Sequence, residues 1–528
     1  MKPAFNLIDE PWIPAISNKG KELKLGLRDV ILKSHTLREI YDASPVVTAA
    51  LYRLLLALLH RVYGPYSVAD WKDLYRNKRF PREPLEKYLK KWRPRFWLFH
   101  SKHPYYQTIE PPPKVEPKGI GYMRFESADS GMVDRQRLFD HGADDYSTRI
   151  PFDMAARLLV AYQNYALGGT GNLIWETGEK DTKKWSFKDS PLSRGVFFLV
   201  KGANLFETLV LNMVGLRKDR PLPGTLTRDD RPAWEQDEWV PSWSTTPKGY
   251  LDILTWRSRR ILLVRDDEKK SVVGFHRGQG DALYDDYIDP QMTILRRANR
   301  LSPLKFRTDR ALWRDSTALL RLTAGGAGNG ERPPEQIIWL AELVDAGHLP
   351  PSKRFDISAY GLCAERAKVH FWRRESLPIP LRYLENQGLV ETLQYCLGKA
   401  EDVSRSLYSV AMDLSRKLST REDAPRLFEH LNPQPYYWSA LEPAFFRVMD
   451  DVAESGESDP EQRIVRAWVK TLYYTALEAF DTVVKDLDRS AKALKAVTEA
   501  EGYLRSMLFS EENSPLRDYL DVIKGGER

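Results

Sequence analysis

The pattern that most constrains the fold begins near residue 383. From there on, apolar residues recur at helical spacing through four long runs, which are 389–418, 439–452, 461–484 and 491–508. Breaks in the pattern fall around Asn432-Pro433 and 455–460. Four amphipathic helices with short connections bury their apolar faces against one another in a bundle. We therefore predict a C-terminal four-helix bundle over residues 376–528.

Residues 1–375 have a mixed pattern instead. Short apolar segments at 196–200 and 261–264 predict strands, whereas periodic segments at 46–62 and 152–165 predict helices. The expected fold class is thus α+β, with a large mixed α/β domain over residues 1–375 followed by the four-helix bundle.

The most apolar segment of the chain, 46–62, carries Arg53, His60 and Arg61 and is too short to span a bilayer comfortably. We interpret it as a buried helix. Residues 1–6 lack the apolar core of a secretion signal. We expect a cytoplasmic protein with no membrane partner.

Charge is divided unevenly along the chain. The formal net charge is +7, but residues 376–528 carry 19 Lys and Arg against 26 Asp and Glu, a net −7. Residues 1–375 therefore carry +14. A basic first part fits a polyanionic partner, and the split suggests different partners for the two parts. Chance clustering of surface charge is the alternative.

Signatures of catalysis are missing from the sequence. The two cysteines, Cys363 and Cys396, are too few for a cysteine-rich zinc module or a disulfide framework. There is no P-loop, no HExxH helix and no GxSxG motif. The sequence predicts no enzymatic activity, no metal and no cofactor. The alternative is a metal-dependent nuclease site built from Asp285, Asp286 and Asp289, although such carboxylates also occur in solvated turns.

The sharpest local feature is Gly168-Gly169-Thr170-Gly171, directly after the helix expected at 152–165. Because glycine lacks a Cβ, the backbone of such a loop can approach a phosphate or enter a narrow groove. A helix C-cap followed by a turn is the competing interpretation.

Several segments are basic. Residues 87–107 combine lysine and arginine with aromatic side chains, which suits either nucleic-acid binding or an amphipathic helix with its aromatic side chains packed inward. Two further basic clusters are Arg296, Arg297 and Arg300, and Lys368, Arg373 and Arg374. Clusters spread over so long a chain suit a large surface better than a single pocket.

One set of motifs resembles a known family. The opening segment FNLIDEPWIP at 5–14 is similar to the start of the CasA family, the large subunit of the type I-E CRISPR surveillance complex Cascade. The resemblance continues, in the same order, through the glycine segment, GANLFET at 202–208, RALWR at 310–314 and the stretch from Gly361 to Arg373. It covers nearly the full length of the chain, including the helical C-terminus.

The resemblance implies a non-catalytic role in RNA-guided defence. Members of this family recognise the protospacer-adjacent motif (PAM) of double-stranded target DNA and help to open the duplex beside it. The expected partners are double-stranded target DNA, the guide RNA 5′ handle, the Cascade backbone and small subunits, and the helicase–nuclease that the family recruits.

The resemblance also assigns residues. It implies a minor-groove loop at Gly168, Gly169, Thr170, Gly171 and Asn172, and a basic groove-facing cluster at Arg296, Arg297 and Arg300, where relatives have a lysine. It implies a wedge at Ala364, Glu365 and Arg366, where relatives often have Asn-Gln, and contacts to the guide-RNA end at Phe139, His141 and Arg149. Arg366 is the expected wedge residue because its planar guanidinium is able to stack on a base.

Three functions stay open at this point. The first is PAM recognition within an RNA-guided complex, and the second is the metal-dependent nuclease. The third is a generic RNA-binding scaffold subunit, which predicts little preference for duplex DNA that carries a PAM.

Overall fold

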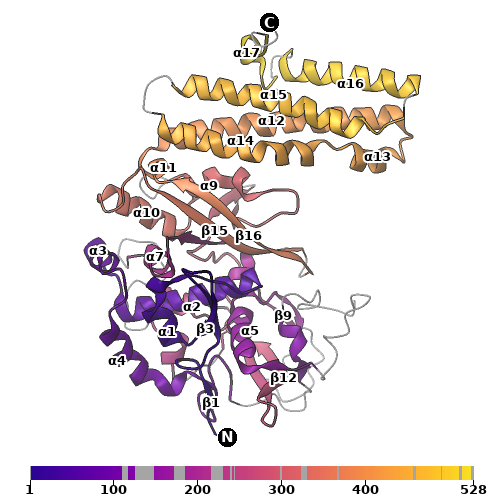
Figure 1. The fold of residues 1–528 in the computed structure, drawn as a ribbon. Coiled ribbons are helices and arrows are strands. Elements are labelled where there is room, and N and C mark those ends of the chain that lie inside the picture. The colour runs from indigo at the N-terminus through magenta and orange to yellow at the C-terminus, as the bar shows by residue number, and fades with distance from the viewer. Residues whose placement is uncertain are drawn as a thin grey trace. The chain divides into compact units, whose positions relative to one another are not determined.

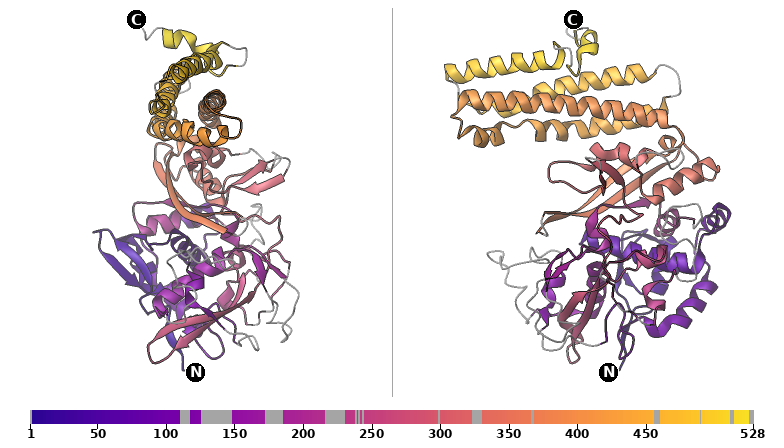
Figure 2. Two further views of the ribbon diagram at one scale, coloured as in Figure 1. Left: turned by 90° about the vertical axis from the view of Figure 1, so that its right-hand side faces the viewer. Right: turned by 180° about the vertical axis from the view of Figure 1, so that it is seen from behind.

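The computed structural model describes residues 2–109, 117–124, 148–171, 185–215, 230–237, 239, 241–242, 244–297, 300–322, 330–365, 368–455, 460–488, 490–510 and 514–524. The chain divides into two compact units. The first comprises Met1–Leu312, Leu322–Pro350 and Arg354–Ile379, and the second comprises Trp313–Arg321, Pro351–Lys353 and Pro380–Arg528. Figures 1 and 2 show the elements of each unit.

The first unit mixes helices and small sheets, as the sequence predicts. Its helices are α1 (Leu27–Leu32), α2 (Pro45–Tyr63), α3 (Val68–Arg76), α4 (Arg82–Trp92), α5 (Phe152–Tyr165), α7 (Leu205–Leu211), α8 (Tyr250–Leu254) and α10 (Glu335–Asp345). Antiparallel pairing joins β1 (Ala4–Asn6) to β5 (Trp97–Phe99), and joins β2 (Ile13–Ser17) to β3 (Glu22–Leu25) and β4 (Leu37–Ile40).

The remaining described strands of this unit form one four-stranded sheet, one three-stranded sheet and two short hairpins. β11 (Arg259–Asp266) and β12 (Ser271–Gln279) form a hairpin, and β12 also pairs with β6 (Lys118–Gly119) and β7 (Ile150–Pro151). β10 (Phe197–Lys201) pairs with β15 (Arg354–Glu365), which neighbours β16 (Lys368–Pro380). Two short hairpins, β8 (Gly169–Gly171) with β9 (Trp185–Phe187) and β13 (Ile294–Arg297) with β14 (Arg300–Pro303), complete the set.

Helix α2 lies at the centre of the first unit. It begins with Pro45 in its first turn, where the missing N–H of proline costs nothing, and it ends at Gly64, whose φ of +85° suits glycine. Residues 46–60 are buried throughout, and all of them except Thr48, Arg53 and His60 are apolar. Among the described residues, α2 is long and apolar enough to cross a membrane, but 83% of its most apolar window is buried inside the protein. It is thus the core helix that the sequence predicts.

One charged side chain of α2 is fully buried. The Arg53 guanidinium donates to Asp289 Oδ2 at 2.6 Å, to Gln291 Oε1 at 2.7 Å and to the carbonyl oxygen of Ile253 at 2.6 Å. Arg53 and Asp289 are 0% and 1% exposed. A buried cation of this kind is tolerated because its charge and most of its donors are matched. Arg53 therefore joins α2 to the end of α8 and to the segment before β13.

The second unit is helical. Its long helices are α12 (Gln387–Leu418), α14 (Gln434–Glu454), α15 (Pro460–Val484) and α16 (Ala491–Phe509), with shorter helices α9 (Ser316–Leu320), α11 (Arg382–Glu385), α13 (Ala424–Leu431) and α17 (Leu520–Lys524). The four long helices match the four predicted runs, and the α+β fold class is confirmed. α14 begins five residues before its predicted run at 439, because Pro435 occupies its first turn and the apolar periodicity starts only later.

Aromatic and polar contacts hold this unit together. Trp468 of α15 donates through Nε1 to the carbonyl oxygen of Cys396 in α12 at 2.8 Å, and Tyr437 of α14 donates to the carbonyl oxygen of Ala400 at 3.1 Å. The segment before α9 belongs here too, because Arg314 forms a two-pronged ion pair with Glu401 at 2.9 Å. The sequence pattern did not predict this excursion of the chain into the second unit.

Replacing Arg53 by Met is expected to destabilise the protein strongly. The change leaves the Asp289 carboxylate buried without its cation, which costs about 3–5 kcal/mol. The measurement is the free energy of unfolding by urea titration. The matched control is Arg82→Met, because Arg82 pairs with Glu86 on the surface of α4, where about 1 kcal/mol or less is at stake. Equal losses in the two variants would contradict a special role for Arg53.

Candidate nucleic-acid interface

The glycine segment forms a strand of a hairpin. α5 ends at Tyr165, and β8 then pairs with β9 in the antiparallel register Gly169↔Phe187, Thr170↔Ser186 and Gly171↔Trp185. Just before β8, the Gly168 N–H donates to Asp189 Oδ1 at 2.6 Å. Residues Gly169–Gly171 are therefore extended strand, and form neither the open loop nor the helix cap and turn that the sequence suggested. Asn172 lies outside the described residues. We call β8 and β9 the glycine hairpin.

A buried arginine that the sequence analysis missed holds both ends of the glycine hairpin. Arg259, the first residue of β11, donates to the carbonyl oxygens of Leu167 at 2.9 Å and Lys188 at 2.8 Å. Burial lowers the pKa of Arg259 to about 10, so it remains a cation at neutral pH. The sequence signal that could have identified Arg259 is its spacing. It alternates with Ile261 and Leu263, the buried apolar residues on the same face of β11.

The predicted arginine cluster lies on one hairpin. Arg296 and Arg297 end β13, Arg300 begins β14, and all three are exposed. Arg297 and Arg300 stand directly opposite each other in the ladder, where like charges repel. In the described part of the chain, neither forms an ion pair. We call β13 and β14 the arginine hairpin.

The predicted wedge falls at the tip of the longest hairpin in the first unit (Figure 1). Ala364 and Glu365 end β15, Lys368 begins β16, and Ala364 is exposed. Arg366 lies outside the described residues. We call β15 and β16 the long hairpin.

The segment after the glycine hairpin, the end of β14 and the middle of β15 meet around Gly195. This residue follows the glycine hairpin through a short 3-10 turn and leads into β10, the neighbour of β15. A Cβ on Gly195 would lie 2.8 Å from Pro303 Cβ at the end of β14, and Val196 donates to the carbonyl oxygen of Leu304 at 2.9 Å. A Cβ on Gly361 of β15 would lie 3.5 Å from the Gly195 carbonyl oxygen. The structure thus brings together three segments that are far apart in the sequence.

The predicted contacts to the guide-RNA end are described only in part. Phe139 and His141 lie outside the described residues. Arg149 forms an ion pair with Asp266 at the end of β11. The Lys269 N–H and the Arg149 guanidinium lower the pKa of the Asp266 carboxyl, so this pair is charged at neutral pH.

Two of the three acidic residues considered for a nuclease site, Asp285, Asp286 and Asp289, form ion pairs with other residues. Asp289 binds Arg53 in the core, and Asp285 pairs with Lys188 at 3.0 Å. Within the described ranges, no three His, Cys, Asp or Glu side chains are placed to hold one metal ion. The structure therefore does not assemble the site that this alternative requires.

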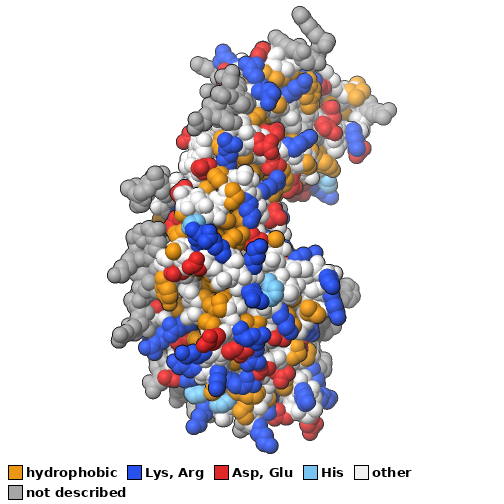
Figure 3. Space-filling view, turned by 60° about the vertical axis from the view of Figure 1, so that its left-hand side comes forward, with side chains coloured by type: hydrophobic (Ala, Val, Ile, Leu, Met, Phe, Trp, Pro, Cys, Tyr) orange, Lys and Arg blue, Asp and Glu red, His pale blue; other side chains and the backbone are white. Residues whose placement is uncertain are grey.

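The two other basic segments have structural partners. In α4, Leu85 and Leu89 are buried while Lys90 is exposed, so the part of residues 87–107 that lies in α4 is amphipathic, whereas residues 93–107 lie beyond this helix. On the face that Figure 3 brings forward, Lys and Arg side chains are interspersed with Asp and Glu. In the third cluster, Arg373 pairs with Glu375 at 2.7 Å and Arg374 pairs with Glu39 at 3.2 Å.

Comparisons with known proteins agree over nearly the whole chain. The family model described as CRISPR-associated protein Cse1 matches residues 6–479. The CRISPR-associated protein CasA/Cse1 of Thermus thermophilus is 30% identical over 522 residues, which cover 94% of this chain and 96% of that protein.

Solved structures share the fold. The crystal structure of Thermus thermophilus CasA matches with a TM-score of 0.77 at 28% identity, over 95% of this chain and 98% of that one. Thermobifida fusca Cse1 matches with a TM-score of 0.79 at 24% identity, over 96% and 98%. A chain of a CRISPR RNA-guided surveillance complex matches with a TM-score of 0.73 at 22% identity, over 96% and 100%.

Replacing Gly168 by Ala is expected to disturb the glycine hairpin. The added Cβ would lie 2.6 Å from the Phe187 carbonyl oxygen, so the hairpin has to shift, at a cost of about 1–3 kcal/mol. The measurement is the free energy of unfolding in urea. The control is Gly398→Ala in α12, where a Cβ meets nothing within 4 Å and alanine is expected to stabilise the helix by about 0.5–1 kcal/mol. Stabilisation in both variants would contradict the close contact.

Proposed function

The chain belongs to the CRISPR-associated Cse1 (CasA) family, and on that premise we propose that it is the PAM-recognising large subunit of a type I-E RNA-guided DNA surveillance complex. In this role it binds double-stranded target DNA, helps to open the duplex beside the PAM and carries out no chemistry of its own. The guide RNA supplies most of the sequence specificity by base pairing, while the protein reads a short flanking motif.

The observation that carries this proposal is the pair of opposed arginines on the arginine hairpin. Arg297 and Arg300 face each other at the end of the ladder, and no described carboxylate pairs with either of them. Such an arrangement costs stability in the free chain, and an anion that binds both guanidinium groups offsets that cost. The closely spaced phosphates of a DNA duplex are anions of this kind.

The glycine hairpin supports readout of the minor groove. β8 presents three residues of which two have no side chain, so its backbone is able to approach the floor of a narrow groove. The minor-groove pattern distinguishes A·T from G·C pairs but little else. A backbone reader of this type therefore accepts several flanking sequences.

The long hairpin supports duplex opening. Its tip is the place that the family resemblance assigns to the wedge, and the strands behind it are 12 and 13 residues long. Opening one base-pair step costs about 1–2 kcal/mol of stacking. One stacked side chain and a few phosphate contacts suffice to offset that cost.

The remaining partners follow from the same proposal. They are the guide RNA 5′ handle, the Cascade backbone and small subunits, and the helicase–nuclease, all within the cytoplasm. The support is the fold shared with a chain of an RNA-guided surveillance complex and the net charge of −7 over residues 376–528, which suits protein partners better than nucleic acid.

A generic RNA-binding scaffold is the second candidate. The opposed arginines favour it as well, because phosphate contacts carry no sequence information. The two candidates differ in whether binding depends on the sequence that flanks the target.

Replacing Gly169 by Leu is expected to weaken PAM-dependent binding selectively. The complex is reconstituted with this chain, and its affinity is measured for duplexes with a randomised flanking trinucleotide. A leucine side chain on β8 keeps the backbone away from the groove, so the affinity for preferred flanks should fall at least ~10-fold while non-specific binding changes less than ~2-fold.

The control for that experiment is Gly502→Leu in α16, where a Cβ meets nothing within 4 Å. It should leave flank preference unchanged. Binding that is independent of the flank in the unaltered complex would favour the scaffold over PAM recognition.

Replacing Arg297 and Arg300 together by Gln is expected to flatten the salt dependence of duplex binding. Each lost phosphate contact lowers the magnitude of the log–log slope by about 0.9, so the double variant should lose about 2. The control is Lys87→Gln with Lys90→Gln, which removes the same charge from α4. An unchanged slope in the arginine variant, or an equal loss in both, would remove the arginine hairpin from the DNA interface.

A further inference from the structure

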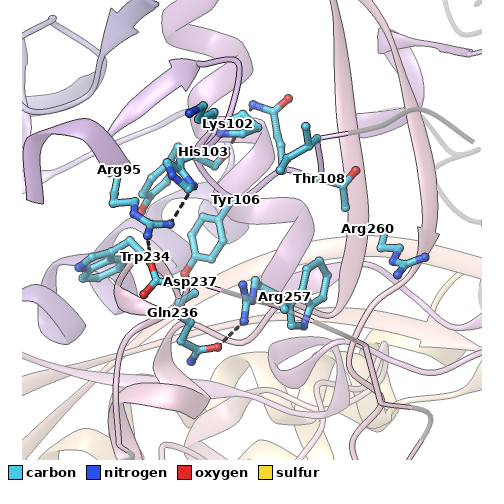
Figure 4. Close-up of a pocket in the computed structure, with 16 residues that line it drawn as sticks. Arg95, Lys102, His103, Tyr106, Thr108, Trp234, Gln236, Asp237, Arg257 and Arg260 are labelled. Carbon is cyan, nitrogen blue, oxygen red and sulfur yellow. Dashed lines mark hydrogen bonds and ion pairs between the residues drawn. The ribbon is translucent and has the colours of Figure 1, made fainter.

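A cavity of about 440 Å³ lies in the first unit, and none of its lining residues belongs to the glycine, arginine or long hairpin. Its walls are residues 102–109, which follow β5, with Arg95 at one side (Figure 4). The other lining residues are Ala233, Trp234, Gln236, Asp237, Trp239, Arg257 and Arg260. We call it the Arg257 cavity. Its volume falls within the range of small-molecule sites.

Cationic side chains outnumber carboxylates among the residues that line the Arg257 cavity. Arg95, Lys102, Arg257 and Arg260 line it, whereas Asp237 is the single carboxylate among its described lining residues. The Asp237 side chain is 82% exposed and forms an ion pair with Arg95. Among the described residues, neither Lys102 nor Arg257 forms an ion pair, so an anion that contacts both would gain charge-assisted hydrogen bonds here.

Arg257 has N–H donors that the described contacts do not use. Of its five N–H groups, the described contacts use one, in a hydrogen bond to the Gln236 side chain. The charges of Asp281 and Asp252 act on Arg257 and raise its pKa, but the hydrogen bonds described for these carboxylates come from other donors, such as Trp239 Nε1 to Asp281 at 2.7 Å and the Lys248 N–H to Asp252 at 2.8 Å. Burial lowers the pKa of Arg257 to about 10, which still leaves it charged at neutral pH.

Two further side chains add donors beside Arg257. Lys102 is exposed on another wall, and its ammonium forms no ion pair with any residue in the described ranges. His103 Nδ1 lies 3.0 Å from Arg95 Nη1, and since arginine only donates, Nδ1 accepts and the proton of the neutral ring lies on Nε2. Burial and the nearby Arg95 lower the pKa of His103, which favours this neutral form.

The same cavity offers flat surfaces. Tyr106 lies between the Arg95–His103 pair and Arg257 in Figure 4. The Arg257 guanidinium also stacks on the Trp239 ring, with Cζ 4.4 Å from the ring centroid. Aromatic rings and arginine planes are the surfaces on which nucleobases stack.

We propose that the Arg257 cavity binds a nucleotide, with its phosphate bound by Arg257 and Lys102 and its base packed against Tyr106 and Trp239. The combination of several cations with planar surfaces selects a ligand that is both multiply anionic and aromatic. This site is separate from the proposed duplex interface, and it holds whether or not the hairpins read a PAM. The nucleotide is supplied either free in solution or as one residue of a single strand.

The test measures binding to the full-length chain by isothermal titration calorimetry. The probes are AMP and UMP, the matching nucleosides, inorganic phosphate, and a 5′-phosphorylated RNA octanucleotide. We expect the nucleotides to bind at least ~10-fold more tightly than either the nucleosides or phosphate alone. A free nucleotide as ligand predicts binding of AMP or UMP, whereas a strand as ligand predicts binding of the octanucleotide alone.

Variants distinguish nucleotide binding in the Arg257 cavity from non-specific electrostatic attraction of anions to the basic surface. Arg257→Gln and Lys102→Gln should each weaken binding at least ~10-fold, and Lys102 is a surface residue whose change leaves the core intact. Arg257→Lys should also bind less well, because lysine keeps the charge but loses the planar stack. The control is Arg82→Gln, which removes one exposed charge elsewhere in the same unit.

Three outcomes would overturn the proposal. They are no binding of any probe, equal affinity for nucleosides and nucleotides, and equal weakening by Lys102→Gln and Arg82→Gln. Duplex binding by the reconstituted complex, measured on the same variants, should remain unchanged, because the cavity does not contribute to the hairpin surface.

Discussion

Two buried arginines anchor the exposed glycine and arginine hairpins to the core of the first unit. Arg53 binds Asp289 and Gln291, and the chain runs from there through Met292 directly into β13 and the arginine hairpin. Arg259 binds carbonyl oxygens at both ends of the glycine hairpin. Each exposed hairpin is thus tied to a charge inside the core. Moving the partners of a buried charge is costly, so these contacts with the core fix the position of each hairpin.

The long helices were predictable because apolar periodicity is a property of neighbouring residues in the sequence. The long helices of the second unit and α2 and α5 of the first follow from apolar periodicity, and their ends fall close to the predicted bounds. The family resemblance was also visible in short ordered motifs such as the segment at 5–14, and the comparisons confirm it. The glycine segment was identified, but its strand character was not, since β8 pairs with a strand that begins 14 residues after its own last residue.

The arrangement of the candidate interface could not be predicted, because it depends on contacts between residues that are far apart in the sequence. The sequence pattern did not single out Gly195, yet β10, β15 and the end of β14 meet at this residue. The third basic cluster looked equivalent to the arginine hairpin, but Arg373 and Arg374 are paired with Glu375 and Glu39. Glu39 lies 335 residues before Arg374, so only the tertiary fold separates arginines that stabilise the protein from arginines that face solvent.

The opposition of Arg297 and Arg300 has a consequence for the dynamics of the free protein. Their mutual repulsion makes the end of that ladder its least stable part until an anion lies between the two guanidinium groups. Occupancy and local order are then thermodynamically linked, because a ligand that favours the closed ladder also shifts its opening equilibrium. Under the proposed function, binding of a polyanion therefore stiffens the arginine hairpin, and release restores its motion.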